Sequence, residues 1–282
     1  MELMPRTARA VAVTGDGSIV RTAIEIDDDA AVAARAAVLK VTSDEVTALG
    51  IAAHADVAPP GPAAINGGRA EPQVFSTGAA AVIAETWKGA ARGLRHAVCL
   101  VIGERVTAGI SLDGRPWLGA HGLAGAASWL ALNPVERQDY RKFGSLAAEV
   151  SSAAIARRLA WRIQAGDQSD VLERAGKLEA ITAAHVFEGA RGGDGVAISV
   201  IRDTAKYIGM AVANLATLID PDIVVLGGSV TAARDLLLDP VRQECARRLP
   251  PAMVSEFRCE MSPLGDDGIA LGAARLAMIA SA

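Results

Sequence analysis

Cysteines and aromatic residues are scarce in this chain of 282 residues. The three cysteines, Cys99, Cys245 and Cys259, follow no metal-ligand spacing, and Cys99 lies in an apolar run. We therefore expect buried free thiols in a reducing compartment and no metal centre. Aromatic residues make up only 4% of the chain while alanine is abundant. This composition predicts helices that pack closely through small side chains.

The chain also lacks long apolar runs and basic stretches. No run approaches the roughly 18 residues that a membrane span needs, and the first residues lack the pattern of a secretory signal. Lysine and arginine are scattered and the net charge is −4, which argues against a nucleic-acid partner. With 51% hydrophobic residues the chain can still bury a substantial core. We expect a soluble cytoplasmic protein that contacts neither membrane nor nucleic acid.

Periodicity and turn residues predict strands that alternate with helices. Beyond a hairpin over residues 8–26, the predicted strands are 46–53, 98–102, 106–112, 223–226 and 253–261. The predicted helices are 29–39, 77–93, 145–164, 178–190, 202–219, 231–248 and 267–279. Residues 58–73, rich in proline and glycine, predict an irregular loop. The alternation indicates an α/β fold with buried sheets.

Residues 181–230, which include the run D-P-D-I-V-V-L-G-G-S-V, resemble the nucleotide-side half of a ROK-family (repressor, open reading frame, kinase) sugar kinase. Residues 74–125 and 264–274 resemble two further segments of that family. The resemblance implies two ribonuclease-H-like domains of the actin-like ATPase superfamily around a cleft. The N-terminal domain would hold 1–98, in shortened form, together with 266–282. The C-terminal domain would hold 99–265.

The first phosphate loop of the family is an aspartate followed by Gly-Gly-Thr, whose glycines let backbone N–H groups approach the ATP phosphates. Aligned at Thr7, this chain has Leu3 in place of the aspartate and Pro5 and Arg6 in place of the glycines. Because proline has no N–H group, the usual cradle is not expected. Arg6 is either a phosphate ligand by charge or a solvated arginine.

The catalytic base of the family is an aspartate in Asn-Asp-x-Asn-Ala-Ala, at the start of a helix. Here the run is S-T-G-A-A-A, which puts Thr77 at the base position after Ser76. A threonine hydroxyl has no pKa near 7, and removal of a positioned base costs about 10²–10⁴ in rate. We therefore assign no catalytic residue. Ser76 and Thr77 are candidates for substrate binding or, alternatively, for helix capping.

Other polar motifs of the family are replaced as well. Glu104 lies in the second phosphate loop, where it would repel a triphosphate. Ala126 and Trp129 take the places of the Glu and His that bind the sugar, and Trp129 is either a sugar-stacking residue or a core or lid tryptophan. Ser145 and Ala147 replace a zinc-binding cysteine and a sugar-binding glutamate. No zinc site is expected.

The nucleotide side keeps more of the family pattern. Gly103 remains from the second phosphate loop, and Gly227, Gly228 and Ser229 follow a strand and open a helix. Backbone N–H groups at such a place can meet an anion or a ribose, although glycines there also serve close strand–helix packing. His121, in H-G-L-A-G, is a candidate for substrate binding or makes an ordinary loop hydrogen bond.

Three hypotheses of function follow. The first is a sugar-kinase-like protein that is catalytically impaired or inactive and is retained to bind a small carbohydrate or nucleotide or to interact with another protein. The second is an active glucokinase-like sugar or amino-sugar kinase that uses ATP and Mg²⁺, with a base relocated to Asp56, Glu85 or Glu104. The third is a ROK-type transcriptional regulator without its DNA-binding domain. Whether the chain is an enzyme stays open.

The resemblance also implies a homodimer joined through the C-terminal domain. An apolar stripe within residues 145–160 offers a second indication, formed by Leu146, Val150, Ile155 and Leu159. This stripe faces either a partner or the core of its own chain.

Overall fold

The computed structural model describes residues 1–42, 46–54, 57–59, 61 and 71–281. They form two compact units. Unit 1 comprises Met1–Cys99, Ala108–Ala124 and Ser262–Ala282. Unit 2 comprises Leu100–Thr107 and Gly125–Met261.

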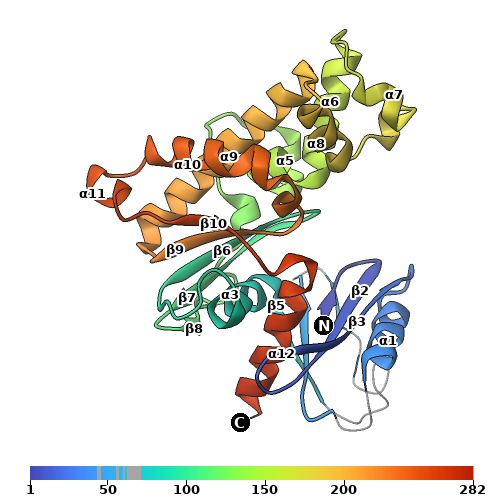
Figure 1. The fold of residues 1–282 in the computed structure, drawn as a ribbon, viewed down its shortest axis with the longest axis vertical. Helices are drawn as coiled ribbons and strands as arrows, with labels where there is room; N and C mark the ends of the chain where they lie inside the picture. The colour runs from blue at the N-terminus through green and yellow to red at the C-terminus, as the bar shows by residue number, and fades with distance from the viewer. Residues whose placement is uncertain (43–45, 55–56, 60, 62–70, 282) are drawn as a thin grey trace. The chain divides into compact units, whose positions relative to one another are not determined.

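Unit 1 contains a five-stranded mixed sheet of order β3-β2-β1-β4-β5 (Figure 1). Its strands are β1 (Glu2–Leu3), β2 (Thr7–Val13), β3 (Ile19–Ile26), β4 (Leu49–Ala53) and β5 (Pro72–Ser76). The pairs β1–β2 and β2–β3 are antiparallel, whereas β1–β4 and β4–β5 are parallel. The helices are α1 (Ala30–Val41), α3 (Thr77–Lys88) and α12 (Gly268–Ala280).

The predicted hairpin and the helix after it are confirmed. In the turn between β2 and β3, Asp16 accepts a hydrogen bond from the Thr14 hydroxyl at 2.5 Å, and its other oxygen accepts one from Ser18 at 2.8 Å. Asp29 caps α1, because its carboxylate accepts the Ala31 N–H at 2.8 Å. These local contacts explain why the sequence alone located both elements.

Helices of unit 1 pack through glycine and alanine, as the composition predicts. A Cβ atom on Gly272 of α12 would lie 1.8 Å from the carbonyl oxygen of Ala80 in α3. A Cβ atom on Gly50 of β4 would lie 1.9 Å from the carbonyl oxygen of Ala273. Helix α12 therefore contacts both α3 and β4 at backbone distance, which larger side chains would prevent.

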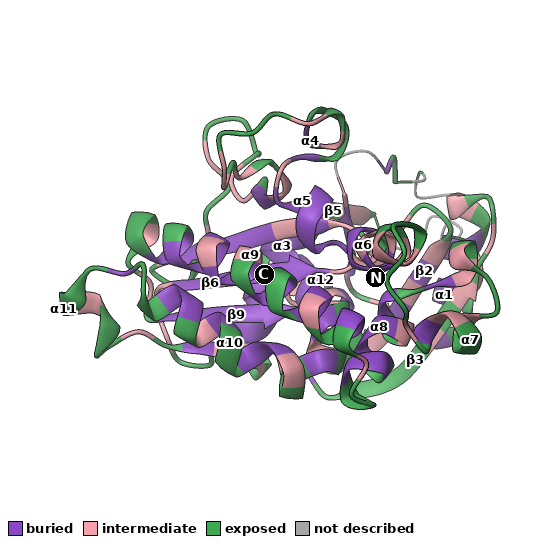
Figure 2. Ribbon diagram, turned by 90° about the horizontal axis from the view of Figure 1, so that it is seen from above, coloured by how far each residue is buried: buried purple, intermediate pink, exposed green. Residues whose placement is uncertain are grey.

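The second sheet has the order β10-β9-β6-β7-β8. Its strands are β6 (Ala97–Ile102), β7 (Val106–Leu112), β8 (Arg115–Pro116), β9 (Ile223–Gly227) and β10 (Cys259–Met261). Strands β9 and β10 run parallel, and Figure 2 shows β6 and β9 buried throughout. The turn between β7 and β8 has positive φ at Asp113 and Gly114, 52° and 76°, which confirms the predicted Asp-Gly turn.

Helices make up most of unit 2. They are η1 (Ala127–Trp129), α4 (Gln138–Phe143), α5 (Ala147–Val150), α6 (Ser152–Gln164), α7 (Val171–Ala175), η2 (Leu178–Ala180), α8 (Ala183–Arg191), α9 (Gly195–Ile219), η3 (Ser229–Ala233), α10 (Arg234–Ala246) and α11 (Pro251–Val254). The 3₁₀ turn η4 (Gly265–Asp267) lies in unit 1. Helix α9 begins earlier than the predicted residue 202, because Asp194 caps it by accepting the Ala197 N–H at 2.8 Å.

Several predicted elements were wrong in detail. The helix predicted over 178–190 is divided into η2 and α8. The helix predicted over 145–164 is interrupted at Ser151, whose ψ of 157° is extended and whose hydroxyl caps α6. The strand predicted over 253–261 is the short helix α11 followed by the three residues of β10. Strand β5 occupies the end of the loop predicted over 58–73, while most of that loop lies outside the described residues.

The apolar stripe proposed for a dimer contact faces the core of its own chain. Leu146, Val150, Ile155 and Leu159 are at most 1% exposed in the single chain. The stripe therefore offers no surface to a partner.

The cysteine prediction is confirmed: all three are free and buried. Burial raises the pKa of the Cys245 and Cys259 thiols to about 12, and that of Cys99 well above its usual range. Among the described residues, no helix is long and apolar enough to cross a membrane.

Candidate functional site

The base position lies at the start of α3. Ser76 ends β5 and caps the helix, because its hydroxyl accepts the Ala79 N–H at 3.2 Å. This confirms the capping alternative for Ser76. Thr77 is only 4% exposed, and its hydroxyl oxygen is buried without a hydrogen-bond partner among the described residues. A hydroxyl closed to solvent in this way cannot take a proton from a ligand unless the helix start moves.

The start of α3 is held against β7 at backbone distance. A Cβ atom on Gly78 would lie 2.1 Å from the Ala108 carbonyl oxygen, and one on Gly109 would lie 1.8 Å from the Gly78 carbonyl oxygen. Two glycines are thus needed for the helix and the strand to meet. This contact fixes the backbone next to Thr77 and keeps its side chain in place.

The turn at the expected first phosphate loop is closed by a backbone hydrogen bond, and its arginine side chain pairs with an aspartate. The Met4 N–H donates to the Thr7 carbonyl oxygen at 2.9 Å and closes the turn that contains Pro5. Arg6 pairs with Asp28 at 2.5 Å, and both side chains are well exposed. The solvated-arginine alternative therefore describes Arg6 in this structure.

The structure brings the nucleotide candidates of unit 2 together. Gly228 follows Gly227 at the end of β9 and has a φ of 82°. A Cβ atom on Gly228 would lie 2.5 Å from the carbonyl oxygen of Ile102, so the close approach of β9 to β6 requires glycine here. The packing alternative accounts for Gly228 without a ligand.

Ser229 and Gly103 lie beside each other. The Ser229 hydroxyl is 2.9 Å from the Ser152 hydroxyl and 3.4 Å from the Ile102 carbonyl oxygen. The Gly103 N–H donates to the Arg105 carbonyl oxygen at 3.0 Å, and the Gly103 carbonyl accepts from Ser152 N–H at 2.8 Å. The polar groups of this corner thus already bind one another. The Ser152–Ser229 pair is the part that remains exposed.

The remaining sugar-side candidates belong to different units. His121 lies in an exposed turn of unit 1 and makes no hydrogen bond or ion pair within the described part of the chain. Trp129 belongs to η1 in unit 2 and is 58% exposed, so it is not a core tryptophan.

The relocated bases considered above differ in their surroundings. Glu85 is 3% exposed and accepts hydrogen bonds from Ser262 at 2.5 Å and from the Ala90 N–H at 2.8 Å. Burial raises the pKa of Glu85, and these two hydrogen bonds oppose that rise. Glu104 is exposed in the turn between β6 and β7. Asp56 lies outside the described residues.

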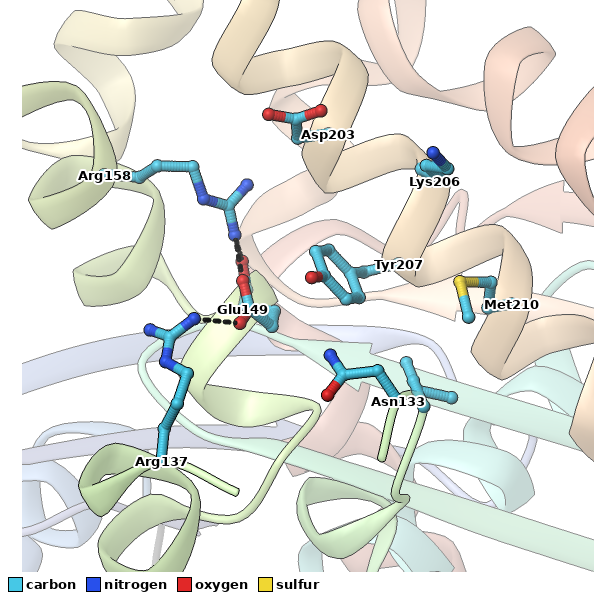
Figure 3. A pocket seen from close by; sticks show the side chains of 9 residues that line it. Asn133, Arg137, Glu149, Arg158, Asp203, Lys206, Tyr207 and Met210 are labelled. Carbon is cyan, nitrogen blue, oxygen red and sulfur yellow. Dashed lines mark hydrogen bonds and ion pairs between the residues drawn. The ribbon is translucent and has the colours of Figure 1, made fainter. Parts of the chain in front are cut away.

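A group of side chains that the sequence reasoning missed is centred on Glu149 in α5. Glu149 is 4% exposed and accepts hydrogen bonds from Arg158 at 2.7 Å, Arg137 at 2.9 Å and the Tyr140 hydroxyl at 2.5 Å. Figure 3 shows both guanidinium groups directed at this carboxylate from different elements. Burial and the bond to Glu149 raise the pKa of Tyr140, which keeps its hydroxyl proton in place. We call these four residues the Glu149 cluster.

The Glu149 cluster occupies the segment where the resemblance implies a zinc loop. It joins the residues before α4, α4 itself, α5 and α6 through charge and hydrogen bonds. The described residues contain no group of three or more His, Cys, Asp or Glu that could hold a metal ion. The available signal was a lone acidic residue inside the apolar run A-A-E-V, which must be paired if it is buried.

Comparison with known proteins identifies the family. Residues 70–279 match the ROK family. The chain belongs to the ROK family. A glucokinase of Halalkalibacterium halodurans is 30% identical over 194 residues, which are 68% of this chain and 59% of the glucokinase. A xylose repressor of Caldicellulosiruptor bescii is 26% identical over 208 residues, 72% of this chain and 50% of the repressor.

The ROK fold extends over the whole chain. A ROK-family glucokinase from Streptomyces griseus, solved in complex with glucose and AMPPNP, superposes with a TM-score of 0.87 at 24% identity. The superposition covers 99% of this chain and 98% of that enzyme. The predicted α/β fold of the actin-like ATPase type is thereby confirmed. The curated relatives are longer, since the chain spans 59% of the first glucokinase and 62% of a glucokinase of Thermotoga maritima.

Proposed function

We propose that this ROK-family protein binds a small carbohydrate or nucleotide but transfers phosphate poorly or not at all. The observation that carries the proposal is the base position. Thr77 supplies a hydroxyl in place of a carboxylate, and that hydroxyl is closed to solvent. General-base catalysis needs a group of suitable pKa within hydrogen-bond reach of the reacting hydroxyl. Thr77 meets neither requirement in this structure.

The two alternative bases that the structure describes, Glu85 and Glu104, do not compensate for this loss. Glu85 is buried and its carboxylate is already bound by Ser262 and Ala90. Glu104 is an exposed residue of unit 2, in the turn that would have to receive the triphosphate. The Glu104 carboxylate in that turn would oppose the charge neutralisation on which phosphoryl transfer depends.

The comparisons support two further functions. The glucokinase relatives favour an active ATP- and Mg²⁺-dependent sugar kinase. The repressor relative favours a transcriptional regulator of the same family. We place the impaired kinase first because both the base position and the first phosphate turn depart from what the chemistry requires, and these two sites are far apart in the sequence.

Coupled ADP release with glucose, mannose, N-acetylglucosamine and N-acetylmannosamine tests the proposal. We expect no turnover with any of these sugars. Turnover of about 1 s⁻¹ or faster, the range of ordinary kinases, would refute the proposal. Calorimetric titration with glucose and with AMPPNP then tests ligand binding, and binding of neither would leave only the interaction role.

The variant Thr77→Val tests whether the Thr77 hydroxyl takes part in any residual turnover. Valine has nearly the same shape as threonine and lacks the hydroxyl. If Thr77 takes no part in chemistry, any residual turnover is unchanged in Thr77→Val. Loss of that turnover would show that the hydroxyl acts in the reaction.

We also propose that the protein forms a homodimer, as its family membership suggests. The buried stripe in α5 and α6 is not the interface. Unit 2 carries other exposed apolar residues, among them Trp129, Val135 and Phe143. Light scattering at micromolar concentration tests the state, and a mass near the 29.0 kDa of one chain at all concentrations would contradict it.

A further inference from the structure

Unit 2 contains a cavity of about 400 Å³ between α9 and the segment before α5. This volume lies within the usual range for small-ligand sites. None of the sugar or nucleotide candidates lines it. Figure 3 shows Asp203, Lys206, Tyr207 and Met210 of α9 on one side of it, and Asn133, Arg137, Glu149 and Arg158 on the other.

The charges around the cavity favour an anion. Glu149 is neutralised by two arginines, each of which lines the cavity. Lys206 adds a third cation and Asp203 a second anion. Counting Arg137, Arg158 and Lys206 against Glu149 and Asp203, the walls carry one excess positive charge.

Lys206 is the cation of this wall that has no partner within the described part of the chain. Within the described part of the chain, neither Lys206 nor Asp203 makes a hydrogen bond or an ion pair, although both belong to α9 and are three residues apart. An ammonium group that no carboxylate satisfies is available to a ligand from solution. Charge-assisted hydrogen bonds of this kind are about twice as strong as neutral ones.

The arginines are held in place before any ligand arrives. Arg158 donates to the Glu149 carboxylate at 2.7 Å and to the Thr204 hydroxyl at 3.3 Å, and its side chain is only 16% exposed. Arg137 donates one N–H to Glu149 at 2.9 Å and lies 3.9 Å from the Asp139 carboxylate, and it keeps further N–H donors, since a guanidinium carries five. Fixed donors lower the entropy cost of binding.

We propose that this cavity binds a small organic anion that carries one carboxylate or one phosphate monoester. Lys206 and the remaining N–H groups of Arg137 bind the anionic group. The side chains of Tyr207 and Met210 contact its carbon skeleton. The site is independent of phosphoryl transfer and of the function proposed above, because none of its residues is a candidate for sugar or nucleotide binding.

Calorimetric titration of the full chain in a buffer without phosphate tests the proposal. The probes are glucose 6-phosphate, gluconate and inorganic phosphate, with uncharged glucose as the comparison. We expect saturable binding of one equivalent of glucose 6-phosphate or gluconate, and the stronger of the two identifies the anionic group. Absence of saturable binding by all three anions up to about 10 mM, a concentration at which even weak specific sites fill, would overturn the proposal.

Two substitutions in the cavity wall, one expected to weaken anion binding and one expected to strengthen it, test whether the anion binds in this cavity. Lys206→Met should weaken binding about 10-fold or more, because a hydrogen bond to a charged group is lost. Asp203→Asn should strengthen it about threefold, because a nearby negative charge is removed. Lys177→Met removes the same charge from an exposed lysine of unit 2 that does not line the cavity, and should leave binding unchanged.

If Lys206→Met and Lys177→Met weaken binding equally, the anion responds to net charge alone and the cavity is not its site. Neither lysine is buried, so both variants are expected to fold. Equal melting temperatures of the two variants and the unmodified chain check this point.

Discussion

Replacing Glu149 by leucine is expected to destabilise the protein strongly. The carboxylate is 4% exposed and accepts hydrogen bonds from two arginines and a tyrosine. Leucine would leave Arg158, with 16% of its side chain exposed, as a largely buried and unpaired charge. Breaking a buried ion pair in this way costs about 3–5 kcal/mol.

Not every contact of Glu149 contributes equally to that figure. Arg137 is 38% exposed, so water screens its pairing and replaces part of what is lost. Tyr140 keeps one hydrogen bond, because Asn133 donates to its hydroxyl at 3.2 Å. The main term is thus the Arg158 pair, which places the expected loss near the lower end, about 3 kcal/mol. For a unit of this size that corresponds to a fall in melting temperature of roughly 10 °C.

The double variant Glu149→Leu with Arg158→Met tests the cause. Removing both charges leaves an apolar contact, and such replacements are often neutral. We expect differential scanning calorimetry to show most of the lost stability restored. The matched control is Glu136→Leu, which breaks an exposed pair with Arg141 in the same segment and should not change the melting temperature measurably. A double variant as unstable as Glu149→Leu alone would refute the reasoning.

Two further predictions concern unit 1 and the corner between β6 and β9. Burial raises the pKa of Glu85 above its ordinary value of 4.5, so its ionised form opposes folding and stability falls as pH rises above about 4.5. Glu85→Gln can accept the Ala90 N–H and donate to the Ser262 hydroxyl, and it should flatten the fall of melting temperature as pH rises above about 4.5; an unchanged profile would contradict this. Gly228→Ala should cost more than about 1 kcal/mol, because φ is 82° and the new Cβ would meet the Ile102 carbonyl oxygen. Gly166→Ala, with a φ of 108° but open space around it, should cost less in the same denaturation experiment.

Local signals made much of the fold predictable. Asp29 caps α1 and the Asp113–Gly114 turn joins two strands, and both act through residues adjacent in sequence. The break at Ser151 was not predictable in this way. Residues 145–164 are rich in helix formers, and the interruption is accompanied by a contact from outside the helix, since the Ser152 N–H donates to the Gly103 carbonyl oxygen. A contact between residues so far apart in the chain leaves no periodic pattern in the sequence from which the break could be predicted.

The candidate site was predictable only in part for the same reason. The motif located Thr77 and the glycines around Gly228, because family positions are read along the chain. It could not show that the Thr77 hydroxyl is closed to solvent, which depends on the approach of β7 to α3. It also could not show that Arg137, Glu149 and Arg158 meet, because loops and a helix break separate them.

The segment 126–149 lacks the polar ligands of the family, and the Glu149 cluster stabilises it in their place. The family resemblance places sugar and zinc ligands at Ala126, Trp129, Ser145 and Ala147, where this chain has none. A segment of short helices and turns still needs interactions that repay its conformational entropy. The Glu149 cluster supplies them with one carboxylate and three donors. Because a single carboxylate joins these elements, its removal should loosen this segment first, before the buried strands β6 and β9 are affected.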